Sequence, residues 1–355
     1  MALGTRERLS RVLLVREWEA LYDEAERQAI VGVLLGGLEH LPDEQLPSLE
    51  LKLQWIGLVQ IMEAEYRLHV ERTWELAERF RTVGFRSCVL KGVAMARYYP
   101  EPSRRQCGDI DLWTFPVKGE RLEVRAYSVT KFRRNVMKWL RSQYEIDHNV
   151  WHNVGVKVFE DVPVEIHFHP GWLWNPWNNR KLQKFFEKYT SYIFHHTADI
   201  GYNVMPVEFD AVFSLVHTYR HLIVGGVGLR HVVDYYYVLK QVKGGRFGGS
   251  EDILHQTSYI LHQLGMQRFV SGMMWVMKEV CGASDELLLC KPNEKEGIFL
   301  LSEIMEGGNF GQKRKDGKFR NSFSRWMMMV KHYPSEMLWM IPWKIWHKGW
   351  RLIYG

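Results

Sequence analysis

The chain has 355 residues, of which 46% are hydrophobic and 14% are aromatic. This composition is typical of a globular protein with a sizeable core, and it excludes a chain that is disordered throughout. The formal net charge is +6, but residues 312–355 hold ten Lys and Arg residues against two acidic residues. This segment contributes +8 and the rest of the chain −2, so the basic character belongs to the C-terminal end.

The sequence lacks the patterns of a membrane span and of a secretory signal. No run approaches the roughly 18 uninterrupted apolar residues of a transmembrane helix, and charges interrupt the apolar patch near the N-terminus. The four cysteines form neither a CxxC pair nor a dense framework; they are Cys88, Cys107, Cys281 and Cys290. We therefore expect no transmembrane segment and a reduced, cytoplasmic setting.

Residues 1–83 are predicted to form an N-terminal helical region. Between Leu51 and Trp74 a mostly apolar stripe recurs at helical spacing. Gly84 follows at a position where a glycine commonly ends a helix.

Residues 84–170 have a mixed pattern that predicts an α+β core. The expected elements, in chain order, are a strand at 85–90, a helix at 93–99, a strand at 107–115, a basic amphipathic helix at 130–143 and a hairpin within 154–170. After Pro170 the pattern is mostly helical, with a break at 225–228. We therefore expect a mainly helical C-terminal region over residues 171–355, ending in a basic, Trp-rich tail.

Two acids interrupt the predicted strand in the stretch RRQCGDIDLWTF, residues 104–115. Side chains alternate along a strand, so Asp109 and Asp111 are expected on one face, about 6–7 Å apart, with Ile110 and Leu112 on the other. Beside a core, two like charges would repel each other and lose hydration, and a divalent cation removes both costs. Acids at strand ends and in turns are also common without any metal.

A third acid lies in PVEIHFHP, where Glu165, His167 and His169 alternate with apolar residues. If this strand pairs with the strand of Asp111, Glu165 completes a three-carboxylate site. A solvated strand face is the alternative for Glu165. A zinc site made of Glu165, His167 and His169 is disfavoured, because positions i and i+4 of a strand lie about 13 Å apart.

These motifs resemble a known family. LKGVAMARYYPEPSRRQCGDIDLW (90–113), with VEIHFH (164–169) downstream, resembles the uncharacterised nucleotidyltransferase family of the polymerase-β-like superfamily. GGVGLRHVVDYYYVL (225–239) resembles the GLRxLxD helix of that family. The resemblance extends to about residue 240. It implies an α+β fold with a small mixed β-sheet flanked by helices, and a two-metal transfer of a nucleotidyl group.

Carried across residue by residue, the resemblance implies that Asp109 and Asp111 bind Mg²⁺ or Mn²⁺. Glu165 would be the third carboxylate, which binds the catalytic metal and takes the proton from an acceptor hydroxyl. The implied donor is a nucleoside triphosphate, with the metal ions neutralising its charge. The acceptor is unknown.

The resemblance also implies nucleotide-binding residues. Lys91 and Gly92 occupy the strand-to-helix turn where the superfamily cradles phosphate, although many relatives have Gly-Gly or Gly-Ser there. A free helix N-terminus could bind the anion, whereas a lone strand-end lysine is ordinarily solvated. Gly108 permits close approach of a ligand. Arg105 could pair with the acids or clamp phosphate oxygens.

Arg230 has two interpretations. It could reach the triphosphate, or it could form a structural salt bridge with Asp234, because positions i and i+4 lie on one helical face. We favour the structural salt bridge.

The basic tail at 312–355 interleaves its positive charges with tryptophans, namely Trp326, Trp339, Trp343, Trp346 and Trp350. Such a pattern suits nucleic acid or another acidic partner, and it also suits a helix on an anionic membrane. We favour a third interpretation, in which short helices bury Trp and Met while the cations extend to water. Pro334 and Pro342 are predicted to divide the segment.

The leading hypothesis is therefore a metal-dependent enzyme that transfers a nucleoside monophosphate from a nucleoside triphosphate to an unknown acceptor. A degenerate module that binds nucleotide or RNA without chemistry is the first alternative. A metal-dependent phosphohydrolase, with water in place of the acceptor, is the second.

Overall fold

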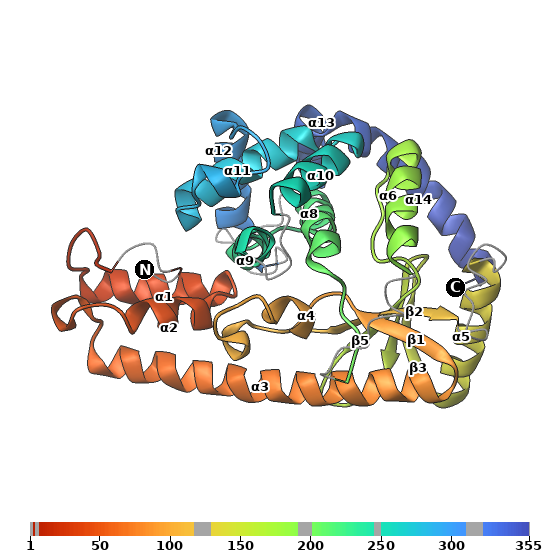
Figure 1. The fold of residues 1–355 in the computed structure, drawn as a ribbon, viewed down its shortest axis with the longest axis horizontal. Helices are drawn as coiled ribbons and strands as arrows, with labels where there is room; N and C mark the ends of the chain where they lie inside the picture. The colour runs from red at the N-terminus through yellow and green to blue at the C-terminus, as the bar shows by residue number, and fades with distance from the viewer. Residues whose placement is uncertain are drawn as a thin grey trace. The chain divides into compact units, whose positions relative to one another are not determined.

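In the computed structural model, residues 3, 7–116, 129–190, 201–244, 250–309 and 322–354 are described, and they form α-helices and a five-stranded β-sheet (Figure 1). The chain divides into two units. Unit 1 contains Met1–Arg67, Ala96–Gln106 and Ser214–Ser324, and unit 2 contains Leu68–Met95, Cys107–Phe213 and Arg325–Gly355. The division into consecutive regions 1–83, 84–170 and 171–355 remains a proposal.

The sheet of unit 2 has the strand order β1-β2-β5-β4-β3. Its strands are β1 (Phe85–Val89), β2 (Ile110–Pro116), β3 (Glu145–Asn149), β4 (Asn153–Lys157) and β5 (Val164–His167). Only β2 and β5 pair in parallel, and the other neighbours are antiparallel, so the sheet is mixed. The predicted α+β class and the predicted hairpin are confirmed. Strand β3 was not predicted.

One face of this sheet packs against two helices, α5 (Val129–Gln143) and the C-terminal part of α3 (Leu49–Thr82). An aromatic cluster marks the contact: Phe80 of α3 lies 5.0 Å from Trp139 of α5, and Phe85 of β1 lies 5.8 Å from Trp139, between ring centroids. Leu112 and Ile166, on the two paired central strands, are fully buried on this face. The core therefore fixes which residues of β2 and β5 point the other way.

The opposite face of the sheet packs against α6 (Pro176–Thr190) and the start of α8 (Val207–Val224). Trp113 of β2 stacks on Phe209 at 6.0 Å and lies 6.3 Å from Phe186 of α6. Asp111 precedes Trp113 by two residues and so lies on this second face.

The C-terminal segment forms α13 (Ser322–His332) and α14 (Pro334–Tyr354). Pro334 is the first residue of α14, where a missing N–H is tolerated. Pro342 lies inside α14, so the prediction that it divides the segment was wrong. Its ring removes the helical partner of the Leu338 carbonyl, and Leu338 is exposed, so water can solvate that group.

The predicted burial in this segment is confirmed for methionines only: Met337 and Met340 are buried, whereas Trp339, Trp343 and Trp350 are half-buried and Trp346 is exposed. Glu336 is also buried, and its carboxylate accepts the backbone N–H of Trp174 at 2.6 Å. The basic residues between 310 and 321 lie outside the described residues; they are Lys313, Arg314, Lys315, Lys318 and Arg320.

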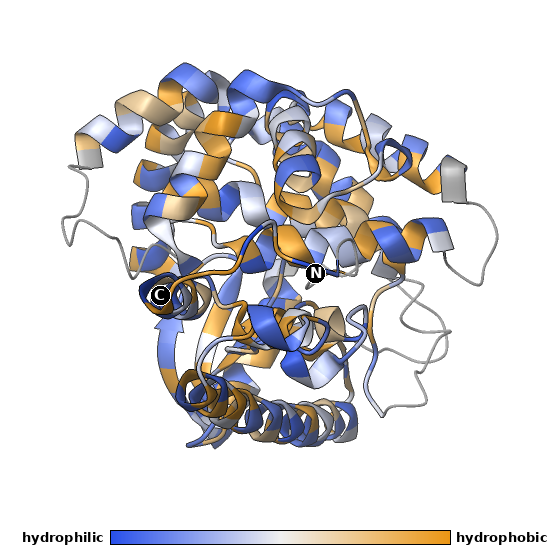
Figure 2. Cartoon of the chain, turned by 90° about the vertical axis from the view of Figure 1, so that its left-hand side faces the viewer, coloured by the Kyte–Doolittle hydropathy of each residue, from blue (hydrophilic) through white to orange (hydrophobic). Residues whose placement is uncertain are grey.

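Unit 1 is helical in its described residues. Its α-helices are α1 (Val15–Arg27), α2 (Val31–Leu38), the first part of α3, the later part of α8, α9 (Leu229–Gly244), α10 (Ser250–Gln263), α11 (Gln267–Cys281) and α12 (Glu294–Gly307). Short 3₁₀ turns lie at Asp43–Gln45, Pro102–Arg104 and Asp285–Leu287. Hydrophilic and hydrophobic residues alternate along the helices, as in amphipathic helices (Figure 2).

The predicted N-terminal helices are confirmed, as is the break between α8 and α9. Gly84, just after α3, has φ of +83°, which a glycine adopts readily. Within the described ranges, every helix is too short or too polar to cross a membrane.

A buried ion pair joins two segments of unit 1. Arg105 donates from Nε and Nη2 to the two carboxylate oxygens of Asp234, at 2.7 and 2.8 Å, and the Tyr99 hydroxyl donates to Oδ1 at 2.6 Å. Burial raises the pKa of Asp234, but the charge and hydrogen bonds of Arg105 outweigh it, so this pKa lies below its ordinary value. Arg230, the predicted partner, donates to the Gln106 carbonyl at 2.8 Å, and its charge also lowers the pKa of Asp234.

Replacement of Asp234 by alanine should lower the free energy of unfolding by about 3–5 kcal/mol, because it leaves the Arg105 charge buried without its carboxylate. Urea denaturation at neutral pH measures this. The control is Glu39→Ala, which breaks the half-exposed pair of Glu39 with Arg104 and should cost less than about 1 kcal/mol. Equal losses in the two variants would contradict the prediction.

The effect of Asp234→Ala should also depend on pH. The folded-state pKa of Asp234 is depressed, so its contribution is complete above the unfolded value of about 3.9 and is lost as the pH falls through the folded value. The stability difference between wild type and Asp234→Ala should therefore be constant near neutrality and shrink in acid. A difference that grew on acidification would oppose this assignment.

Candidate metal and nucleotide site

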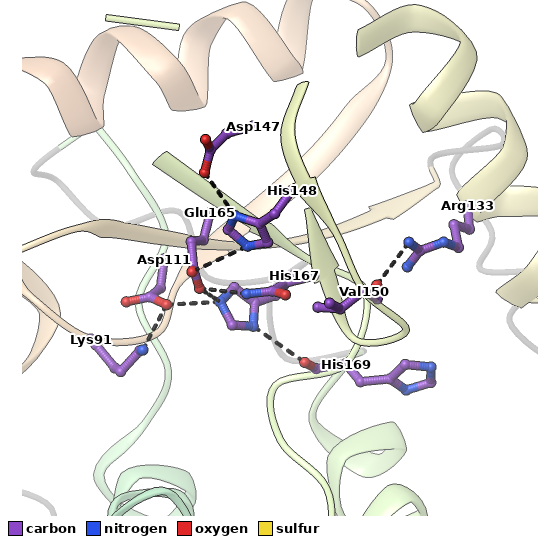
Figure 3. Close-up of polar contacts among 10 residues, drawn as sticks. Lys91, Asp111, Arg133, Asp147, His148, Val150, Glu165, His167 and His169 are labelled. Carbon is purple, nitrogen blue, oxygen red and sulfur yellow. Dashed lines mark hydrogen bonds and ion pairs between the residues drawn. The ribbon is translucent and has the colours of Figure 1, made fainter. Parts of the chain in front are cut away.

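The parallel pairing of β2 with β5 brings two acids together in unit 2. Asp111 and Glu165 are register partners across the two strands, which confirms the pairing expected from the sequence. Asp111 is completely buried, whereas the Glu165 side chain is 25% exposed. The cluster therefore has a buried member and a partly exposed member. The two carboxylates lie close together in Figure 3.

His167 joins these acids from the same face of β5, two residues after Glu165. Its Nε2 donates to Asp111 Oδ1 at 2.7 Å and lies 3.3 Å from Glu165 Oε2. Burial lowers the pKa of His167, but the hydrogen bonds that its ring donates to Asp111 and Glu165 outweigh burial and raise this pKa to about 9. His167 is thus protonated at neutral pH. Burial raises the pKa of Glu165, but the hydrogen bond and charge of His167 lower it. The pKa of Glu165 therefore lies below its ordinary value.

Lys91 contacts the cluster from the turn after β1. Its Nζ lies 2.7 Å from Asp111 Oδ1, and its side chain is 20% exposed. Burial lowers the pKa of Lys91, but attraction by Asp111, Asp109 and Glu165 outweighs burial and raises it overall. Lys91 is therefore paired with Asp111, which excludes the alternative of a fully solvated lysine.

Gly92 is needed for the turn that positions Lys91. Its φ is +55°, and a Cβ there would lie 3.4 Å from the Asp109 carbonyl oxygen. The helix that follows, α4, spans only Val93–Ala96, so the predicted helix over 93–99 was too long. A four-residue helix gives little support to the expectation of an anion at its N-terminus.

Gly108 is exposed, and its carbonyl accepts a hydrogen bond from His69 Nε2 at 2.8 Å. A Cβ at Gly108 would meet nothing within 4 Å, so packing does not require a glycine there. This leaves the predicted room for a ligand near the acids.

Asp109 immediately precedes β2 and is half-buried. The charge of Asp109 helps to raise the pKa of Lys91. It also acts against the lowering of the pKa of Glu165. The three residues whose ligand atoms lie within 4.8 Å of one another are Asp111, Glu165 and His167, the one such group in the described part of the chain. Asp109 is not a member of that group.

The cluster fits a divalent cation in one specific respect. Asp111 Oδ1 contacts Lys91 and His167, but Asp111 Oδ2 is buried without a hydrogen-bond partner among the described residues. A buried carboxylate oxygen that lacks a partner is costly unless something binds it. Three nearby carboxylates also outnumber the two positive groups, and oxygen ligands suit Mg²⁺ and Mn²⁺.

Two further side chains hold Glu165, and the sequence did not point to them. Asn153 of β4 donates from Nδ2 to Glu165 Oε2, and His148 of β3 places Nε2 3.5 Å from Glu165 Oε1. His148 belongs to the unpredicted strand β3. The alternation of Glu165 and His167 along β5 did place His167 on the correct face, but only as part of the disfavoured zinc site.

His169 is separated from the cluster, as the strand geometry predicted. Its ring stacks on Trp151 at 4.2 Å and its Nδ1 lies 3.0 Å from Gln183 Oε1. In Figure 3 the ring points away from Asp111 and Glu165. Burial lowers the pKa of His169 to about 4, so its ring is neutral at physiological pH.

The two candidate arginines, Arg105 and Arg230, belong to unit 1, whereas the acid cluster belongs to unit 2. Within unit 1, Arg105 pairs with Asp234 and Arg230 donates to the Gln106 carbonyl. Their role in binding a nucleotide stays a prediction.

Comparison with known families finds a match over most of the chain. A family model described as uncharacterised nucleotidyltransferase matches residues 15–282, most of the chain. The chain belongs to that family. Membership confirms the resemblance noted in the motifs around Asp109 and Glu165, and it supports a role in nucleotidyl transfer.

A search of solved structures finds an antigenic nucleotidyltransferase-like protein from Paracoccidioides brasiliensis. The match has 13% sequence identity and a TM-score of 0.37, and it covers 64% of this chain and 94% of that one. At this level of similarity no argument rests on it. No curated protein sequence matches the chain.

Replacement of Lys91 by methionine should lower the free energy of unfolding by about 1–3 kcal/mol without divalent cations, because the buried Asp111 carboxylate loses one of its two positive partners. Urea denaturation in the presence of a chelator measures this. Lys157→Met is the control: Lys157 pairs with Glu145 on the exposed edge of the same sheet, so stability should barely change. A stable Lys91→Met protein would show that Lys91 does not hold Asp111.

Proposed function

We propose that the protein is a metal-dependent nucleotidyltransferase that moves a nucleoside monophosphate from a nucleoside triphosphate to an acceptor hydroxyl. The observation that carries this proposal is the buried, unpartnered Oδ2 of Asp111 beside Glu165, in a chain of a nucleotidyltransferase family.

Asp109, Asp111 and Glu165 are the proposed ligands of Mg²⁺ or Mn²⁺. When bound, the ion neutralises the triphosphate and stabilises charge in the in-line displacement. Asp111 is supported for this role because Lys91 and His167 fix its carboxylate through Oδ1 and leave Oδ2 free. Preorganisation of this kind lowers the cost of reorientation during the reaction.

Glu165 is the proposed general base. Its Oε2 is held by Asn153 and His167, and its lowered pKa keeps it ionised at neutral pH. The acceptor oxygen bonds to the α-phosphorus, the bond from that phosphorus to the leaving pyrophosphate oxygen breaks, and the acceptor proton passes to Glu165 Oε1. Pyrophosphate is the second product.

The proposed nucleotide site includes Lys91 and Gly92 at the turn after β1, and Gly108 before the acids. Lys91 carries the positive charge, and the backbone at Gly92 and Gly108 permits close approach of phosphate. Arg105 and Arg230 complete the proposal as phosphate contacts.

A binding module without chemistry is the second candidate, and one observation favours it. Lys91 and His167 already compensate two of the three carboxylates, so the cluster is nearly neutral without any ion. A chain of this kind could bind nucleotide or RNA through the same turn.

The double variant Asp109→Asn with Asp111→Asn should weaken Mg²⁺-dependent binding of nucleoside triphosphate by about 100-fold or more. Removal of residues that only hydrogen-bond to metal ligands already costs about 10–100-fold in affinity, and removal of the ligands themselves should cost more. Isothermal titration calorimetry measures this, and circular dichroism checks the fold. The control is Glu145→Gln with Asp147→Asn, which removes two exposed acids at the same spacing on β3. Unchanged affinity in the first variant would rule out the proposed ligands.

Products separate the remaining hypotheses. Incubation with labelled nucleoside triphosphate, Mg²⁺ or Mn²⁺ and cell extract should give pyrophosphate together with a labelled adduct. Free nucleoside monophosphate without an adduct would indicate a phosphohydrolase. Metal-dependent binding with neither product would indicate the binding module.

A further inference from the structure

Unit 2 contains a second feature that nucleotidyl transfer does not explain, a groove of about 810 Å³ between α5 and α14. The C-terminal end of α14 lies against α5 (Figure 1). Four cationic side chains of α5 line the groove, namely Arg133, Arg134, Lys138 and Arg141, and among the described residues no acidic side chain lines it. We call it the α5–α14 groove.

The positive charges of this groove are not compensated by acidic groups in the described part of the chain. None of the four has a carboxylate partner among the described residues. Arg133 is only 9% exposed, and its guanidinium donates to the carbonyls of Val150 and Trp151, each at 2.9 Å (Figure 3). Burial and the charge of Arg141 lower the pKa of Arg133 to about 10, so it is still cationic at neutral pH. A concave, uncompensated positive surface attracts an anion.

Aromatic rings alternate with these charges. Arg133 lies over the rings of Phe168 at 4.2 Å and Trp350 at 4.8 Å. Trp346 and Tyr354, also in the groove, are 48% and 46% exposed, so part of each ring is open to a ligand. Cations beside open aromatic rings are the pattern that neutralises phosphates while stacking on bases.

The wall of the groove formed by α14 is supported by a row of stacked aromatic rings. His347 stacks between Trp343 at 4.7 Å and Trp350 at 5.8 Å, with interplanar angles of 11° and 6°. Trp343 in turn stacks on Trp172 at 5.5 Å. These rings repeat at positions three or four apart on one face of α14 and fix the helix before any ligand binds.

The groove adjoins the acid cluster through His169. The ring of His169 lines the groove, while its backbone carbonyl lies 3.4 Å from Nδ1 of His167. His167 contacts Asp111 and Glu165 through its other ring nitrogen (Figure 3). His169 and His167 thus connect the lining of the groove to the proposed general base.

We propose that the α5–α14 groove binds a single-stranded nucleic acid, and that the terminal hydroxyl of this strand is the acceptor at Glu165. The acceptor role rests on the proposed function, whereas binding of the strand does not. A membrane surface is the alternative partner, because the exposed apolar residues Ile345 and Leu352 of α14 are close in sequence to two lysines and an arginine. The concave shape and the buried Arg133 favour a flexible strand, since a bilayer surface cannot enter a groove.

The test measures binding of a fluorescein-labelled oligouridylate of about twelve nucleotides by fluorescence anisotropy, without divalent cations. An oligodeoxythymidylate of the same length shows whether RNA or DNA is preferred. Arg134→Ala with Lys138→Ala should raise Kd about tenfold and reduce the slope of log K against log salt by about 1.4, the loss of two phosphate contacts. Trp346→Ala should raise Kd about tenfold with the slope unchanged, and Trp346→Phe should restore binding.

The matched control is Arg180→Ala with Lys184→Ala, which removes an exposed arginine and lysine at the same spacing from α6 of the same unit. Its Kd should stay within about twofold of wild type. Equal weakening in the control, wild-type affinity in both groove variants, or binding to phosphatidylserine vesicles without binding to the oligonucleotides would each overturn the proposal. Groove-dependent binding without extension by labelled nucleoside triphosphate would overturn the acceptor role alone.

Discussion

The parallel pairing of β2 with β5 is the constraint on which the candidate site depends. It places Asp111 opposite Glu165 and Trp113 opposite His167. A shift by one residue would move Glu165 to the other face of the sheet. The core prevents that shift, because Leu112 and Ile166 are fully buried on the opposite face. The positions of Asp111 and Glu165 are thus set by apolar packing on the opposite face of the same two strands.

The sequence predicted most of this arrangement because the strands of the acids alternate with period two. It missed β3, whose residues Glu145–Asn149 are mostly polar and form a strand only by pairing with β4. It also overestimated the helix after Gly92. The helix ends at Ala96, and beyond it Tyr99 donates its hydroxyl to Asp234, far along the chain. Tertiary contacts of this kind leave no trace in local spacing.

The partners of the candidate residues were harder to predict than the residues themselves. Arg105 pairs with Asp234, 129 positions away. His167 on β5 bonds to Asp111 on the neighbouring strand β2. The alternation of residues along β5 could show only that His167 shares a face with Glu165. Sequence spacing identifies side chains that share a face of a strand or helix. Which cation pairs with a given acid is decided by the folded chain, because it depends on which cation comes within hydrogen-bond distance.

Two buried aspartates of the same chain show how a structural ion pair differs from a binding site. Asp234 has partners at both oxygens, since Arg105 bonds to each and Tyr99 adds a further bond. Asp111 has partners only at Oδ1, and its Oδ2 is buried and unsatisfied among the described residues. Packing alone would select against such an atom, because burial without a partner destabilises the fold. A bound cation at Oδ2, as proposed above, would remove this cost, with Lys91 and His167 holding the carboxylate in position to receive it.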